Sequence, residues 1–397
     1  MSGGARAAAG AAHPQRWRTA SLVLWPPAVG TLLHLLVESA TGRAGDLRIL
    51  WRSGASLASG GPLYDPGHEY LYPPVSGWVL APLGLLPFRV ASTLVAAASV
   101  AAVVVSVLLL LRTTAGVRLR TPQGSALAAG TLLLVALSRP VTGLLRLGNV
   151  DLLLLLVLTL AIVLLGRGRD VPAGVLLGAA CAVKPVLLPA LVALLLLGRY
   201  RALAGGGAAL LLLTAAGFLT VPDAAVFTRD VLPLLAAGNR AELAPYDRSV
   251  DGAVDQLGLP APVGLALRAT VLAAACWLAW RCRGRPRAAA EALPLVLVGS
   301  FAAASFAWAD YGAYLLPLLL TVGRPDSLVR AWPAWVGVYL AATTDAWHVQ
   351  QLPQVPDTLL RLVPLWGWLL VLGTCFVREL RGRRDARGRP VPWRPVP

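Results

Sequence analysis

Long apolar runs separated by short polar segments dominate the chain, and this pattern predicts membrane-spanning helices. A run of about 20 apolar residues is enough to cross the hydrocarbon core of a bilayer. We expect an all-α polytopic membrane protein with about twelve transmembrane helices. The predicted spans lie at 20–37, 90–111, 124–138, 149–166, 171–183, 185–197, 203–221, 263–280, 290–308, 311–322, 332–346 and 363–377. Several are short, and Pro185, Pro189 and Pro317 predict broken or partly penetrating helices.

Composition and charge agree with this class. Of the 397 residues, 57% are hydrophobic and 14% are charged, as in proteins that live in the bilayer. The arginines occur in short clusters between apolar runs, not in the single basic stripe of a nucleic-acid-binding protein. We therefore expect membrane lipid around the chain and no nucleic acid partner.

The arginine clusters also predict orientation. Residues 1–19 carry three arginines and no acid, so the positive-inside rule places them in the cytoplasm. The apolar run 75–87 is too short for a crossing. If it only dips into the membrane, every strong arginine cluster falls inside, including the tail 378–397. We expect a plasma-membrane protein with one transmembrane domain at 20–377 and both termini in the cytoplasm.

This topology predicts two long external loops, at 38–74 and 222–262. Asp46 lies in the first, where a lipid-borne substrate would present its head group. An ionisable group at such a boundary is a functional candidate. Around it, Leu47, Leu50, Trp51 and Ala58 fall near one face at helical spacing, which predicts a helix in the membrane interface. The alternatives are a solvated loop acid beside an interfacial helix for Asp46, and a connecting helix that snorkels its arginines for the amphipathic segment.

Lys184 is the only lysine among 35 basic residues, so it is not a typical topology signal. A compact ammonium near the head groups can bind a phosphate, whereas a lone snorkelling lysine is the alternative. Arg146 is the second candidate for the phosphate. The remaining predicted substrate contacts share the outer side of the predicted topology: Tyr70, Tyr72, Asn149, Asp310 and Tyr311.

Other catalytic templates do not occur in the sequence. It has no phosphate-binding Walker loop, no G-x-S-x-G elbow and no H-E-x-x-H motif, and its four histidines are dispersed. We expect no cofactor and no metal. A substrate that is already activated and membrane-borne, such as a polyprenyl phosphosugar, fits what remains. Asp46 is then the predicted general base, and Lys184 and Arg146 hold the phosphate.

Several motifs carry a resemblance to a known family. They are Gly60-Gly61-Pro62-Leu63-Tyr64-Asp65, Tyr70-Leu71-Tyr72-Pro73-Pro74, Gly148-Asn149-Val150-Asp151, Lys184-Pro185, Phe227-Thr228-Arg229-Asp230 and Arg330-Ala331-Trp332-Pro333-Ala334-Trp335. With them, the chain resembles the family 87 glycosyltransferases, C-type enzymes of actinobacteria that use polyprenyl phosphosugars. The resemblance covers roughly residues 20 to 380 and is strongest to the arabinosyltransferases of the family.

The resemblance implies a C-type glycosyltransferase architecture and a specific reaction. An arabinofuranosyl unit would pass from decaprenylphosphoryl arabinose to cell-wall arabinan, with inversion and an alpha-1,3 linkage. One alternative is a mannosyltransferase of lipoglycan synthesis that uses polyprenyl phosphomannose. Trp308-Ala309-Asp310 stands where those relatives carry Trp-x-His, which argues against it. The other alternative is a transporter of a lipid-linked substrate; it would often contain an internal repeat, and none is clear.

Overall fold

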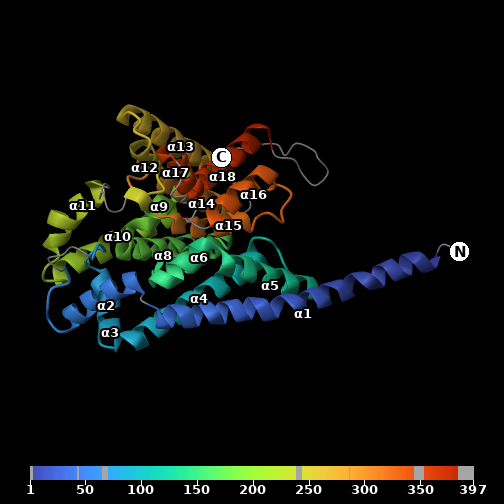
Figure 1. The fold of residues 1–397 in the computed structure, drawn as a ribbon, viewed down its shortest axis with the longest axis horizontal. Helices are drawn as coiled ribbons and strands as arrows, with labels where there is room; N and C mark the ends of the chain where they lie inside the picture. Colours follow the sequence, from blue (N-terminus) through green and yellow to red (C-terminus); the bar gives the residue numbers. More distant parts are fainter. Residues whose placement is uncertain are drawn as a thin grey trace.

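The computed structural model describes residues 3–42, 44–64, 70–237, 244–285, 287–343 and 353–382. Parts of both predicted external loops, of the span 332–346 and of the tail 378–397 therefore lie outside the described residues. Every regular element that is described is helical, which confirms the all-α class. Helix α1 (Gly3–Thr41) runs along one side of the molecule, and its N-terminal part projects beyond the other helices (Figure 1).

Five described helices are long and apolar enough to cross a membrane. They are residues Gln15–Thr41 of α1, α4 (Phe88–Thr113), α10 (Tyr200–Thr220), α13 (Ala261–Arg281) and α18 (Val363–Leu380). A sixth crossing arises if α5 (Pro122–Leu137) and α6 (Arg139–Leu147), bent by 61°, form one broken span. The predicted count of twelve is not confirmed.

Fewer crossings are found among the described residues than predicted, because several apolar helices are short. Helices α7 (Asp151–Gly166), α8 (Asp170–Val183), α9 (Leu188–Leu196) and α14 (Ala288–Ala302) are apolar but have at most 16 residues. The prolines break the predicted spans, as expected. The 3-10 turn η1 begins at Pro185, and Pro317 lies in the four-residue helix α15 (Leu316–Leu319) after the 3-10 helix η4 (Ala309–Leu315).

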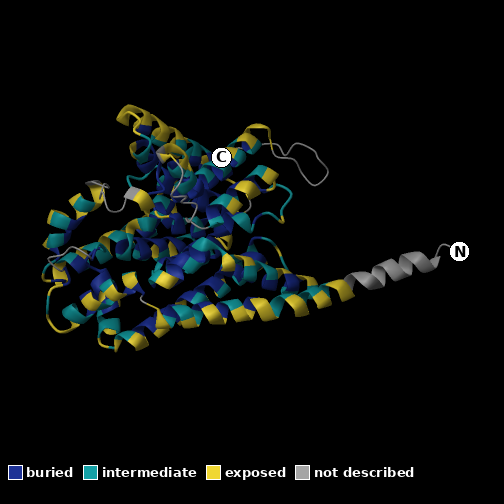
Figure 2. Cartoon of the chain, viewed as in Figure 1, coloured by how far each residue is buried: buried dark blue, intermediate teal, exposed yellow. Residues whose placement is uncertain are grey.

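Small residues let the central helices approach closely. A Cβ atom on Gly174 of α8 would clash with the Ala202 carbonyl oxygen of α10, and one on Gly178 would clash with the Gly206 carbonyl oxygen. This is the packing that apolar helices use in a membrane. The buried residues fill the middle of the bundle, and the outer face of α1 is largely exposed (Figure 2).

The arginine clusters gather at one end of the bundle. Arg281 and Arg285 pair with Glu379 near the end of α18, and Arg287 donates a hydrogen bond to the Thr114 carbonyl after α4. Arg199 pairs with Asp170 at the starts of α10 and α8, and Gly198 beside it lies next to the Arg283 side chain. This confirms that the clusters share a side, and its assignment to the cytoplasm stays a prediction.

The other end of the bundle carries the predicted interfacial helix. Helix α2 (Gly45–Ala58) packs antiparallel to α3 (Ser76–Gly84), and both lie far from the N-terminus (Figure 1). Leu47 and Leu50 are buried and Arg48 is exposed, as the pattern predicts. Ala58, the last residue of the helix, is exposed. With nine residues, α3 does not make a crossing, as expected.

The remaining elements complete this architecture. Between α10 and α13 lie the short π-helical turn η2 (Phe227–Val231), α11 (Leu232–Ala237), the 3-10 turn η3 (Ala244–Tyr246) and α12 (Val250–Gln256). After α15 follow α16 (Trp332–Ala342) and α17 (Gln354–Arg361). Helix α16 packs against α18, on the side of the bundle away from α2.

Candidate active site

Three of the predicted site residues come together at the ends of helices. Asp46 lies in the first turn of α2, Asn149 lies between α6 and α7, and Lys184 lies between α8 and η1. Gly148 adopts a left-handed conformation (φ 67°), which ends α6 and turns the chain toward α2. Lys184 is extended (φ −144°, ψ 112°), because the proline that follows disfavours helical conformation at this position.

The Asn149 side chain connects Lys184 to Asp46. Its Oδ1 accepts hydrogen bonds from Lys184 Nζ at 3.0 Å and from the Asp151 backbone N–H at 3.1 Å. Its Nδ2 therefore faces the other way and donates to Asp46 Oδ2 at 2.7 Å. Two donors on the oxygen fix the amide in the one orientation that presents a donor to the carboxylate.

Lys184 is held by a buried carboxylate. Its Nζ lies 2.8 Å from Asp151 Oδ1, and the two side chains are 14% and 0% exposed. The Tyr314 hydroxyl donates to the same carboxylate oxygen at 3.1 Å, and Lys184 Nζ lies 5.3 Å from the centre of the Tyr72 ring. The cation and the anion compensate each other out of contact with bulk water.

Asp46 has the electrostatic environment of a base. Burial raises the pKa of its carboxyl above the ordinary value of an aspartate, whereas the Asn149 hydrogen bond and the charge of Lys184 act to lower it. The charge of Asp151 also acts to raise it. A carboxylate with a raised pKa is a better proton acceptor than a free aspartate.

Aromatic side chains line the site on the side where α2 packs. Tyr72 stacks on Tyr70 with ring centroids 5.8 Å apart, and Tyr64 packs against Tyr70 at 5.4 Å. Tyr70 is 1% exposed, and its hydroxyl is hydrogen-bonded to Ser76. Tyr70 thus packs behind Tyr72, which is the one that contacts Lys184. Substrate contact by either tyrosine stays a prediction.

The other predicted residues lie farther from Asp46. Arg146 on α6 donates to Glu38 of α1 at 2.9 Å and is 60% exposed. Asp310 is buried and pairs with Arg139 at 3.2 Å. Tyr311 is half-buried and close enough to Lys184 to interact electrostatically. The structure thus brings Asn149, Lys184 and Tyr311 toward Asp46, and places Arg146 in a separate surface pair.

Sequence reasoning did not select Asp151 and Tyr314, which complete the site. A signal for Asp151 was available, since it is a lone acid at the head of the apolar run 152–165. Tyr314 gives no comparable signal, because it is 163 positions away from Asp151 in the sequence. Among the described residues, no three histidine, cysteine, aspartate or glutamate side chains gather as metal ligands.

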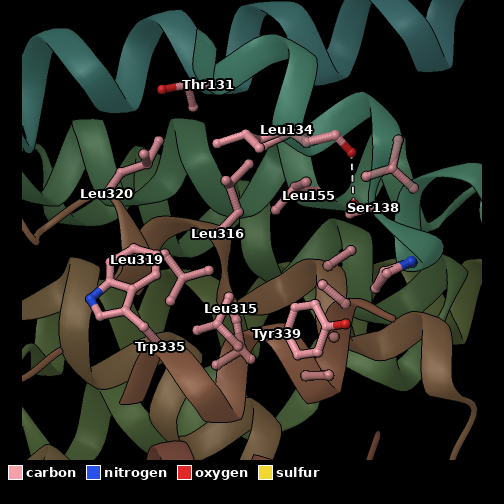
Figure 3. A pocket seen from close by; sticks show the side chains of 18 of the residues that line it. Thr131, Leu134, Ser138, Leu155, Leu315, Leu316, Leu319, Leu320, Trp335 and Tyr339 are labelled. Carbon is pink, nitrogen blue, oxygen red and sulfur yellow. Dashed lines mark hydrogen bonds between the residues drawn. The ribbon is translucent and has the colours of Figure 1, made fainter. Parts of the chain in front are cut away.

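The described residues also enclose an apolar cavity of about 420 Å³ (Figure 3). It is formed by α5, α6, α7, η4, α15 and α16. Leu134 and Tyr339, which line it, are 73% and 62% exposed, so the cavity opens at the surface of the bundle. Its inner lining includes Pro140 and Gly312, which are sequence neighbours of the ion pair between Arg139 and Asp310. The lining of the cavity is thus apolar and adjoins one ion pair.

The described helices form a membrane bundle with a buried charged cluster at one end. Such an arrangement is typical of a functional site in an integral membrane protein. Residues 70–306 match glycosyltransferase family 87, and the chain belongs to this family. The protein is therefore a membrane glycosyltransferase, and the resemblance inferred from the motifs is confirmed.

Curated relatives extend this finding along the chain. The alpha-(1->3)-arabinofuranosyltransferase of Mycobacterium tuberculosis is 30% identical over 384 residues, which cover 92% of this chain and 87% of the relative. The enzyme of the same name from Mycolicibacterium smegmatis is 28% identical, covering 94% of this chain and 90% of the relative. That of Corynebacterium glutamicum is 26% identical, covering 96% and 94%. No solved structure matches.

Proposed function

We propose that this glycosyltransferase transfers an arabinofuranosyl unit from a polyprenyl-phosphate donor to a cell-wall arabinan. The observation that carries the proposal is the geometry at Asp46, a partly buried carboxylate fixed by Asn149 within a cluster that contains one lysine. The names of the relatives support arabinose as the sugar. The resemblance supports decaprenylphosphoryl arabinose as the donor and an alpha-1,3 linkage in the product.

In the proposed reaction, Asp46 takes the proton from the acceptor hydroxyl while that oxygen attacks the anomeric carbon. The bond from this carbon to the phosphate oxygen breaks, and its electron pair leaves with the polyprenyl phosphate. A single displacement inverts the anomeric centre and needs one base, with no covalent intermediate. Asp46 meets the requirement, because its raised pKa favours proton acceptance.

Lys184 is the proposed ligand of the leaving phosphate. Its ammonium has three donors: the Asp151 carboxylate and the Asn149 amide accept two, and the Tyr72 hydroxyl interacts with the ammonium as well. In the proposal a phosphate oxygen takes the place of the Tyr72 hydroxyl. Arg146 is the second proposed phosphate ligand, because its guanidinium is accessible and pairs with only one partner, Glu38, over the described residues.

We infer that the apolar cavity takes the hydrocarbon chain of the donor, because it is apolar, opens at the surface and has lining residues adjacent in sequence to the Arg139–Asp310 ion pair. The substitution Leu134→Trp tests this by narrowing the entrance. Loss of burial for one or two methylene groups costs roughly 1 to 2 kcal/mol, so KM for a long-chain donor should rise by about tenfold. Leu137→Trp is the control, since this exposed residue of α5 does not line the cavity.

Assays with a long-chain donor and with a short water-soluble analogue separate the outcomes. The increase in KM should be confined to the long-chain donor and to Leu134→Trp. An equal increase with both donors, or the same effect in Leu137→Trp, would contradict a role of the cavity in binding the chain.

A transfer assay tests the function itself. Purified protein in detergent is supplied with decaprenylphosphoryl arabinose or polyprenyl phosphomannose, and with a short arabinan acceptor. We expect arabinose transfer only, also in the presence of a chelator. Mannose transfer would support the mannosyltransferase alternative, and binding of either lipid without transfer would support the transporter. Activity that is lost in chelator and restored by a divalent cation would contradict the proposal that no metal takes part.

The proposed location is the plasma membrane, with the active site outside and the arginine clusters inside. The separation of the two ends of the bundle supports this, because Asp46 and Lys184 lie opposite the arginine cluster around Glu379. The orientation follows from the positive-inside rule.

A further inference from the structure

The buried charge of Asp151 has no direct part in the proposed reaction, although it is the best-shielded carboxylate of the site. Its side chain is 0% exposed, so it does not reach a substrate in the site. It receives two hydrogen-bond donors on one oxygen, Lys184 Nζ at 2.8 Å and the Tyr314 hydroxyl at 3.1 Å. These contacts hold the lysine ammonium in one position.

The same residue also contributes through its backbone. The Asp151 N–H donates to Asn149 Oδ1 at 3.1 Å, and Lys184 Nζ donates to that oxygen at 3.0 Å. The Asn149 amide is therefore fixed from two sides. Its NH₂ group is thereby directed to Asp46 and donates to Oδ2 at 2.7 Å.

We propose that Asp151 and Asn149 are positioning residues for the base: Asp151 anchors Lys184, and both fix the Asn149 amide so that its NH₂ group holds Asp46. This inference rests on the proposed role of Asp46 as the base. Over the described residues, the hydrogen bond from Asn149 is the only one to this carboxylate. One oxygen of Asp46 is thus held, and Oδ1 remains for the acceptor hydroxyl.

The neutral amide matters because it separates a cation from the base. A direct ion pair with Lys184 would stabilise the carboxylate strongly and make it a weaker proton acceptor. With Asn149 in between, Asp46 is oriented by a neutral donor, and Asp151 compensates most of the lysine charge. The arrangement orients the carboxylate and keeps it basic.

The other charged and titratable groups around Asp46 do not offer this contact. Tyr72 and Tyr311 act on it electrostatically from the wall of the site. Arg48, two residues along α2, lies over the Phe88 ring at 4.5 Å, and Arg146 on α6 is paired with Glu38. Among the described residues, Asn149 is the one whose hydrogen bonds link the base to Lys184 of the Lys184–Asp151 pair.

An exchange of the amide and the carboxylate tests the proposal. The double variant Asn149→Asp with Asp151→Asn keeps the net charge, the side-chain sizes and a carboxylate partner for Lys184. It replaces the donor that faces Asp46 with a second carboxylate. The acid limb of the pH profile of kcat/KM should then move to higher pH by on the order of one unit or more, because two neighbouring carboxylates disfavour ionisation of both.

The single variant Asn149→Asp should move the acid limb in the same direction, and it leaves the Lys184–Asp151 pair in place. Asp170→Asn is the matched control, since Asp170 is the acid of another ion pair at the opposite end of α8. It should leave the acid limb unchanged. Elution from a sizing column and thermal unfolding in detergent show whether each variant is folded.

The outcomes separate this inference from the proposed function. A folded exchange variant with the wild-type acid limb would overturn the positioning role, even if Asp46 is essential. Wild-type transfer by Asp46→Asn would instead overturn the proposed base, and with it the reason for a positioned amide. A shift in the exchange variant and in Asn149→Asp, without one in Asp170→Asn, would support the proposal.

Discussion

Replacing Asp46 with asparagine is expected to abolish glycosyl transfer while the protein remains folded. The substitution keeps the size of the side chain but removes the proton acceptor, and loss of a general base typically costs on the order of 10²–10⁴-fold in rate. Asp46 lies in the first turn of α2 and is partly accessible, so a neutral asparagine at this position does not disturb the core. The measurement is kcat with the long-chain donor at saturating acceptor.

Two comparisons make this result specific. The control Asp255→Asn changes an exposed acid on α12 and should keep wild-type activity. Donor binding, measured without acceptor, should be retained in Asp46→Asn, because the base acts on the acceptor hydroxyl. If Asp46→Asn transferred sugar at the wild-type rate, another group would have to accept the proton, and the proposed mechanism would fail.

Replacing Lys184 with glutamine should reduce both stability and activity. The substitution leaves the Asp151 carboxylate buried without a cation, and breaking a buried ion pair on one side costs about 3–5 kcal/mol. The midpoint of thermal unfolding in detergent should fall markedly. Transfer should be lost as well, because the leaving phosphate no longer has its ammonium partner.

The double variant Lys184→Gln with Asp151→Asn separates these two effects. With both charges removed, the buried site is neutral, and most of the stability should return. Activity should not return, since the phosphate ligand is still missing. The control Arg199→Gln breaks a more exposed pair with Asp170, which is worth at most about 1 kcal/mol. Recovery of transfer in the double variant would contradict a direct role of Lys184.

The hydrophobic pattern predicted the local features of this fold well. It identified α1, α4, α10, α13 and α18 as apolar helices, because a crossing is encoded by a continuous run of side chains. It also identified the amphipathic helix α2 from the spacing of Leu47 and Leu50, which are buried. The prolines correctly predicted breaks within the shorter spans. The number of crossings was not settled, because short apolar helices can be buried in protein without crossing the bilayer.

The candidate site was predictable only in part. Asp46 and Lys184 stood out because each is unusual where it occurs, an acid at a membrane boundary and a lone lysine. Asn149 was selected with them. Arg146 was selected as a second phosphate ligand on weaker grounds, because arginine is common in this chain; the fold pairs it with Glu38, and its role stays a proposal. Accessibility and pairing are properties of packing, and sequence position alone does not give them.

The class of protein, the helical segments and two of the charged groups at the site could be read from the residues alone, because these depend on the polarity of neighbouring residues. That Asp151 and Tyr314 complete the site, and that Asn149 connects Lys184 to Asp46, follows from how the helices pack. These contacts join the ends of α2, α7, α8 and η4. Helical periodicity tells which residues share a face, whereas the packing of the bundle decides which helix ends meet.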